Sequence, residues 1–278
     1  MSKGTLYIVS TPIGNLGDIS KRAERTLKEA DYIAAEDTRH TLKLLNNLGI
    51  KNALISFFEH SSKEKALGII NLLLEGKDVA LVSDAGTPVI SDPGAPVIEL
   101  CYKNDIPVTA VPGPCAAISA LVLSGISAEK FTFEGFLPKE KPKRREAILN
   151  ALKNPYTTVI YESPHAIKDT LLKIAEIAPE RQAAVVKELT KIHERVYKDT
   201  AKNLSELFSR EENIRGEFII VLAGKEENVP EATDEMIVLE LKALIKKGMS
   251  SKNAIKEVAL KLEAPKNRVY KLYTECVL

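Results

Sequence analysis

An apolar run, Val79-Ala80-Leu81-Val82, leads directly into the sequence Ser83-Asp84-Ala85-Gly86-Thr87-Pro88-Val89-Ile90-Ser91-Asp92-Pro93-Gly94. Four apolar residues fit a buried strand, and the small, turn-forming and acidic residues that follow predict a tight loop at its carboxyl end. Ligands bind at that edge of open α/β sheets. Asp84 and Asp92 can accept hydrogen bonds, and Gly86 and Gly94 let the backbone approach a ligand closely. The sequence indicates a binding loop, although an ordinary strand-to-helix connection has the same composition.

The composition restricts the class of protein. The chain has 278 residues, of which 45% are hydrophobic and 28% charged, and this predicts a globular protein of two domains with a large core. A formal charge of +1 provides no global attraction to nucleic acid or membrane. Cys101, Cys115 and Cys276 form no CxxC pair, so we expect neither disulfides nor a metal site. With no run of roughly 20 apolar residues and no signal peptide, we expect a cytoplasmic protein without membrane association.

Short strand-like runs alternate with helical patterns in the first half of the chain. The runs are Leu6–Val9, Tyr32–Ala35, Ala53–Phe57, Val79–Val82 and Val108–Val111. This alternation predicts a parallel sheet with right-handed crossovers, and therefore an α/β fold. Glu36-Asp37-Thr38-Arg39 follows the second run and is a site candidate, although acidic residues also favour a helix start. The Gly14-Asn15-Leu16-Gly17 spacing lacks the leading Gly-x-Gly of a dinucleotide site.

Four strand-end motifs together carry a family resemblance. They are Thr11-Pro12-Ile13-Gly14-Asn15-Leu16-Gly17-Asp18, Glu36-Asp37-Thr38-Arg39, Ser83-Asp84-Ala85-Gly86-Thr87-Pro88 and Val111-Pro112-Gly113-Pro114. In this order they resemble the tetrapyrrole-methylase superfamily of S-adenosylmethionine-dependent methyltransferases, and within it the branch of ribosomal RNA small subunit methyltransferase I. The resemblance implies 2′-O-methylation of a cytidine ribose in 16S rRNA of the small ribosomal subunit, a homodimer, and two α/β domains with S-adenosylmethionine between them.

The second half adds a dense basic run. Lys139, Lys141, Lys143, Arg144 and Arg145 stand within seven residues, interrupted by one acid. Such a run is commonly a solvated loop or helix start, but it is also the clearest candidate for contacts to RNA phosphates. Ala166 follows His165 where the family often carries arginine. If that arginine contacts RNA, part of the contact must come from elsewhere, and the basic run is the candidate.

The composition changes after Gly224. We expect domains at residues 1–115 and 116–224, a linker at 225–231, and a helix-turn-helix-like module at 232–278. From Leu241 onward the chain has nine Lys or Arg against three Glu, so this module is basic. A small bundle used for dimer or domain packing explains the three predicted helices equally well.

The match of these motifs to those of the family also implies site residues. The predicted cofactor-binding residues are Ile13, Gly14, Asp84, Gly86, Thr87, Cys115, Ala116, Tyr161 and Phe218. For the weakly acidic 2′-hydroxyl, our hypothesis is that Lys187 or Glu188 assists deprotonation while Asp37 and Arg39 place the nucleotide. A structural ion pair is an equally good explanation of Lys187 and Glu188 taken singly.

Two other functions fit parts of the same pattern. A corrin or other tetrapyrrole methyltransferase of the same superfamily would need neither the basic run nor the helical module. A non-catalytic RNA-binding ribosome-assembly factor would not need the acidic loop or the Pro112-Gly113-Pro114 segment. The predicted methyl transfer to RNA uses all of these features and requires no metal.

Overall fold

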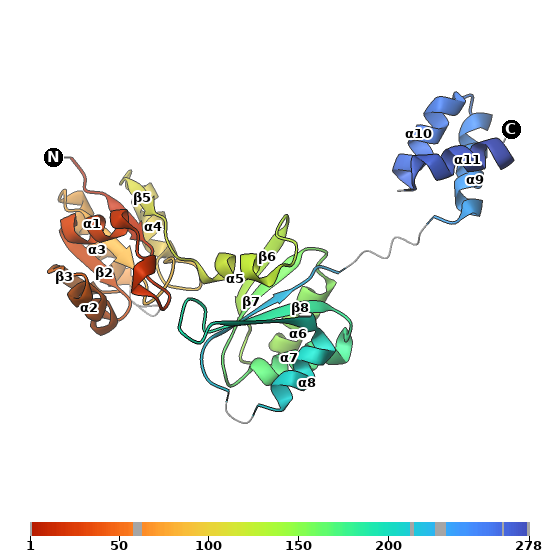
Figure 1. Ribbon diagram of the computed structural model, residues 1–278. Helices are drawn as coiled ribbons and strands as arrows, with labels where there is room; N and C mark the ends of the chain where they lie inside the picture. Colours follow the sequence, from red (N-terminus) through yellow and green to blue (C-terminus); the bar gives the residue numbers. More distant parts are fainter. Residues whose placement is uncertain (1, 58–62, 212–213, 226–231, 263, 277–278) are drawn as a thin grey trace. The chain divides into compact units, whose positions relative to one another are not determined.

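The computed structural model describes residues 2–57, 63–211, 214–225, 232–262 and 264–276. The chain divides into two compact units, Met1–Lys225 and Glu226–Leu278. The predicted linker falls at this boundary, but its residues 226–231 lie outside the described part. The division of the first unit into domains at residue 115 stays a prediction. Figure 1 shows the elements of both units.

The first sheet has five parallel strands in the order β3-β2-β4-β1-β5. The strands are β1 Leu6–Val9, β2 Tyr32–Ala35, β3 Ala53–Ser56, β4 Val79–Val82 and β5 Val108–Val111. The helical elements are η1 Leu16–Asp18, α1 Lys21–Glu29, α2 Thr38–Asn47, α3 Lys63–Leu74 and α4 Ala95–Lys103. Alternate β4 residues enter two separate cores, Leu81 one and Val82 the other, so the sheet is buried on both faces. The predicted α/β class is confirmed.

The second sheet is mixed, in the order β6-β7-β10-β8-β9. Its strands are β6 Phe131–Phe136, β7 Thr157–Glu162, β8 Gln182–Lys187, β9 Arg195–Thr200 and β10 Phe218–Leu222. Its helices are α5 Ala116–Ser124, α6 Lys141–Lys153, α7 Ile167–Ile177 and α8 Ala201–Ser209. Strands β6 and β7 are parallel, whereas β10 is antiparallel to both β7 and β8. Residues of α5 pack with one face of this sheet, and residues of α6, α7 and α8 pack with the other.

The second unit contains the three predicted helices, α9 Asp234–Lys246, α10 Ser251–Lys261 and α11 Lys266–Cys276. They bury a core of their own that includes Ile237, Val258 and Val269. The Thr233 hydroxyl accepts a hydrogen bond from the Met236 N–H and caps α9. Over the ranges described above, no helix in either unit combines the length and apolar character that a membrane crossing requires.

Candidate functional site

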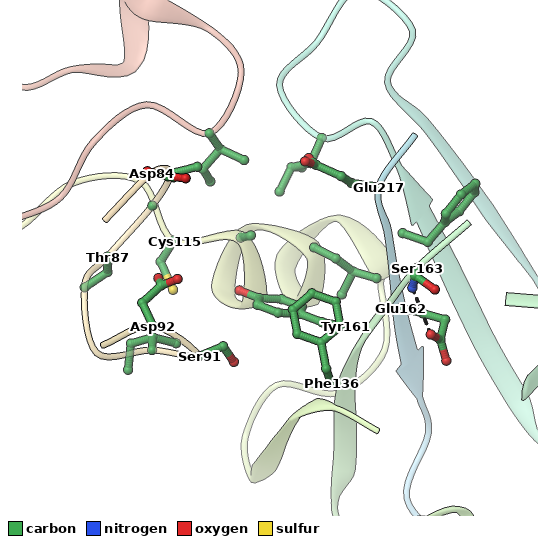
Figure 2. Close-up of a pocket in the computed structure, with 18 of the residues that line it drawn as sticks. Asp84, Thr87, Ser91, Asp92, Cys115, Phe136, Tyr161, Glu162, Ser163 and Glu217 are labelled. Carbon is green, nitrogen blue, oxygen red and sulfur yellow. Dashed lines mark hydrogen bonds between the residues drawn. The ribbon is translucent and has the colours of Figure 1, made fainter. Parts of the chain in front are cut away.

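A cavity of about 460 Å³ lies in the first unit between loops of the first sheet and residues of the second. This volume is within the range of small-molecule sites. The lining consists of Ile13, Glu36, Asp84, Ala85, Gly86, Thr87, Ile90, Ser91, Asp92, Cys115, Ala116, Phe136, Tyr161, Glu162, Ser163, Pro164, Val186, Leu189, Glu217, Phe218 and Ile219. Figure 2 shows the first-sheet loops on one side and the second-half strands on the other.

Backbone pairing holds the first-half loops together. Because β4 lies between β1 and β2 in a parallel sheet, the loops that follow these strands meet at one edge. Thr11 and Gly86 exchange two backbone hydrogen bonds, at 2.8 and 3.0 Å. Gly86 adopts φ +82°, a conformation that glycine accepts without strain. The Thr87 hydroxyl lies 3.0 Å from that of Ser10 and donates to the Pro114 carbonyl at 2.9 Å. The loops after β1, β4 and β5 therefore form one connected wall.

The opposite wall is aromatic. The Tyr161 hydroxyl accepts a hydrogen bond from the Ala117 N–H at the start of α5, and its ring packs edge-on against Phe133 and Phe136. A β-bulge shifts the pairing of β6 with β7 between Phe133 and Gly135, and Gly135 has φ +62°. Bulges redirect side chains next to binding sites. Phe136 follows this bulge, lines the cavity and is 62% exposed.

The cavity is acidic. Its described lining contains five carboxylates, those of Glu36, Asp84, Asp92, Glu162 and Glu217, and no Lys, Arg or His. Two of the five are neutralised from outside the lining. Arg144 forms a buried ion pair with Glu162, and Lys191 pairs with Glu217 at 3.0 Å. The Asp84 carboxylate accepts the Asp37 N–H at 3.1 Å.

Asp92 has the environment of a proton acceptor. Burial, followed by the negative charge of Glu36, raises the pKa of Asp92 to about 6, while a hydrogen bond from Ser83 opposes the shift and the charge of Asp84 adds to it. Burial also raises the pKa of Tyr161 to about 12, with contributions from Cys115 and Asp92. The Asp92 carboxylate therefore interacts electrostatically with Glu36 and Asp84 on its own wall and with Tyr161 on the opposite wall.

Eight of the nine predicted cofactor residues line this cavity, namely Ile13, Asp84, Gly86, Thr87, Cys115, Ala116, Tyr161 and Phe218. Gly14 does not. Its backbone instead faces the second half, where a Cβ would stand 2.6 Å from Cγ of Lys191. The assignment of the nine residues to cofactor binding stays a prediction.

The four predicted catalytic residues do not line the cavity. Asp37 caps α2 and pairs with the exposed Arg39 at 2.7 Å, which holds the pKa of Asp37 well below its usual range. Glu188 accepts hydrogen bonds from Lys191 Nζ and the Glu217 N–H, both at 3.0 Å. Although burial acts to raise it, these bonds lower the pKa of Glu188. Lys187 Nζ lies 3.9 Å from Glu211. Ion pairs therefore engage all four residues.

The basic run divides into exposed and buried members. Four members of the run are exposed: Lys139 before α6, and Lys141, Lys143 and Arg145 within its first two turns. Arg144 is 8% exposed, and it donates to Glu162 and Thr170 inside the second half. The expectation that Arg144 contacts RNA phosphates is corrected, because its guanidinium already binds two buried partners.

The predicted cofactor-binding and catalytic residues do not include Glu36, Asp92 or Phe136, although Glu36 and Asp92 belong to segments that the sequence indicates as site candidates. Asp92 belongs to the predicted binding loop after β4, and its position along that loop does not by itself show that it faces the same cavity as Asp84. A signal for Phe136 was the preceding Gly135, since glycine inside a strand marks a bulge. No group of three or more His, Cys, Asp or Glu side chains in the described part could hold a metal ion.

Known proteins are similar to this chain over most of its length. Residues 5–205 match the family described as tetrapyrrole (corrin/porphyrin) methylases. The chain is 44% identical over 275 residues to the ribosomal RNA small subunit methyltransferase I of Halalkalibacterium halodurans, covering 98% of this chain and 95% of that protein. It is 46% identical to the protein of the same name from Thermotoga maritima over 224 residues, covering 80% of this chain and 100% of that protein.

Solved structures share the fold at low sequence identity. A diphthine synthase matches with TM-score 0.59 at 14% identity, covering 79% of this chain and 90% of that one. A uroporphyrin-III C-methyltransferase from Thermus thermophilus, complexed with S-adenosyl homocysteine, matches with TM-score 0.53 at 18% identity, covering 78% of this chain and 97% of that one.

Proposed function

We propose that this chain, which belongs to the tetrapyrrole methylase family and within it to the branch of ribosomal RNA small subunit methyltransferase I, transfers a methyl group from S-adenosylmethionine to a ribose 2′-oxygen of a cytidine in 16S rRNA. The observation that carries the proposal is a cavity lined by acidic and aromatic side chains, one of which, Phe136, precedes an exposed basic run by three residues.

The described lining fits the cofactor. S-adenosylmethionine carries a sulfonium and an ammonium cation, and a wall of carboxylates without a Lys, Arg or His complements both. When bound, it supplies a methyl group made electrophilic by the sulfonium charge. Backbone around Gly86 and Cys115 would hold it on the first-half side, and Tyr161 and Phe218 on the other. The residues of the cavity then align the methyl group with the attacking oxygen and exclude water.

The RNA contact is supported by the position of the basic run. Phe136 ends β6 at the cavity, and Lys139 follows three residues later. Cations at the amino end of a helix oppose its dipole, so those at the start of α6 do not serve to stabilise α6. They suit phosphate contacts, with Phe136 as a stacking surface for a base. Asp37 and Arg39, at the start of α2 in the first half, would place the nucleotide. Lys187 and Glu188 stand outside the described lining and are engaged in ion pairs, which weighs against the hypothesis that either assists deprotonation.

A homodimer is supported by the outer face of α5. Ile118, Val122 and Leu123 are 46%, 71% and 44% exposed, although α5 packs its other side against the second sheet. Exposed apolar patches of this kind mark interaction surfaces, and a two-fold axis would pair α5 with its copy. An rRNA substrate places the protein in the cytoplasm. The segment from Leu241 onward, with nine Lys or Arg against three Glu, would add contacts to the small ribosomal subunit.

Labelled S-adenosylmethionine tests the function directly. Purified protein is incubated with naked 16S rRNA, with assembled small subunits or with a corrin precursor, and nuclease digestion locates the label. We expect label in a 2′-O-methylcytidine of the RNA. Label in the corrin would favour the tetrapyrrole methyltransferase, and RNA binding without any transfer would favour an assembly factor.

A further inference from the structure

The carboxylates of the cavity differ in the ion-pair and hydrogen-bond partners that they already have. Glu162 and Glu217 pair with Arg144 and Lys191, cations that stand outside the lining. Asp84 accepts a backbone N–H. Asp92 forms no ion pair with any described residue, and its one identified donor is the Ser83 side chain. It therefore retains acceptor capacity that faces the cavity.

Asp92 also stands at the junction of the two walls. Figure 2 shows it beside Cys115, with Tyr161 and Phe136 on the opposite side. The neighbouring Ser91 is held close to the second half, since a Cβ on Gly135 would lie 3.0 Å from its hydroxyl oxygen. The loop that carries Asp92 therefore lies close to residues of the second half.

The lack of a cation in the described lining determines how a hydroxyl can be activated there. The described lining offers no lysine or arginine to lower the pKa of the hydroxyl, whereas it does offer carboxylates that can take the proton. An effective base has a pKa near the working pH, and it must reach the hydroxyl directly or through one water. A half-buried carboxylate surrounded by Glu36 and Asp84 meets the first condition.

We infer that the Asp92 carboxylate accepts the proton of the ribose hydroxyl during methyl transfer, an inference that rests on the proposed function. The ribose oxygen forms a bond to the methyl carbon while the carbon–sulfur bond breaks, and both electrons of that bond stay on sulfur. The hydroxyl proton moves to Asp92, which then releases it to solvent. The titratable groups that face Asp92 are Glu36, Asp84, Cys115 and Tyr161.

Single-turnover methylation of rRNA across pH tests the assignment. The wild-type rate should rise with pH and level off above about 6, the pKa of Asp92. Asp92→Asn should lower the rate by about 100-fold or more and remove this inflection, with calorimetric affinity for S-adenosylhomocysteine unchanged. Asp105→Asn is the matched control, because Asp105 is exposed on the turn before β5 and has a positive φ that asparagine tolerates.

A second measurement does not depend on activity. In ¹³C-labelled protein, the Asp92 carboxyl carbon, assigned by its loss in Asp92→Asn, should titrate near 6, and Asp84→Asn should move this titration to lower pH. Wild-type turnover in Asp92→Asn, a loss confined to cofactor affinity, or titration near the ordinary aspartate value would overturn the inference. If the wild-type protein methylates no RNA, the proposed function fails, and the carbon titration still reports the environment of Asp92.

Discussion

Replacing Arg144 with alanine should destabilise the first unit strongly. The Arg144 guanidinium pairs with Glu162, which is 4% exposed, and the Thr170 hydroxyl donates to the same carboxylate at 2.7 Å. Removing one partner leaves a buried carboxylate without its counterion, which costs about 3–5 kcal/mol. For a unit of this size each kcal/mol lowers Tm by roughly 2–4 °C, so Tm should fall by about 6–20 °C.

The neighbouring Arg145 provides the matched control. It is exposed and forms no ion pair with a described residue, so Arg145→Ala should change stability by less than about 0.5 kcal/mol. The same pair of variants separates structure from RNA binding. Arg145→Ala should weaken rRNA binding and reduce its salt dependence, whereas folded Arg144→Ala should keep the wild-type salt slope. Calorimetric melts and filter binding measure the two effects. Equal melting temperatures for the two variants would refute the role assigned to Arg144.

Three further outcomes are expected. Phe136→Ala should raise KM for rRNA about 10-fold, because stacking on an aromatic side chain contributes roughly 1–3 kcal/mol per base. Its calorimetric affinity for the cofactor should not change. The control Phe131→Ala, at the other end of β6, should have the wild-type KM. Burial and neighbouring carboxylates raise the pKa of Asp92 from 3.8 to about 6, so its ionisation destabilises the fold progressively as the pH rises between these values. Asp92→Asn should therefore raise the free energy of unfolding, measured in urea melts, by about 1 kcal/mol at pH 7, after allowance for partial exposure. Near pH 3 the same substitution should leave the free energy of unfolding unchanged. Val122→Glu should convert a dimer into a monomer in light scattering, because this side chain is 71% exposed on the face of α5 that would form the interface; the Tm of the variant, unlike that of a dimeric wild type, should not depend on protein concentration.

Local patterns predicted the first sheet because its strands are short and rich in apolar residues, and the three inner strands, β1, β2 and β4, are largely buried. The same reasoning missed β9, Arg195–Thr200, whose residues are all partly or fully exposed. Its strand conformation comes from antiparallel pairing with β8, which is a long-range cause. The burial of Arg144, in contrast, corresponds to a pattern that is visible in the sequence. Arg144, Ile148 and Ala151 follow the i, i+4, i+7 spacing of one helix face, and all three are buried.

The candidate site was predictable to the extent that strand ends determine it. Parallel strands bring their carboxyl ends to one edge, so the first-half motifs converge from the chain order alone. The second half depends on backbone detail that residue types do not specify. Glu188 adopts φ +53° directly after β8 and turns toward Lys191 instead of the cavity. The bulge before Gly135 is another backbone detail of this kind, and the residue that follows it, Phe136, lines the cavity.

The order of strands in the second sheet has a consequence for synthesis. Strand β10 is the last one that the ribosome makes, yet it is the middle one of its sheet, hydrogen-bonded to β7 and β8 on its two sides. A nascent chain that ends before Phe218 can complete the first sheet, but it leaves β7 and β8 with open edges that invite aggregation. It also lacks the residues that β10 contributes to the cavity wall. A prematurely released chain therefore has an incomplete cavity wall and two open strand edges, whereas termination just after Leu222 leaves every described strand of both sheets in place.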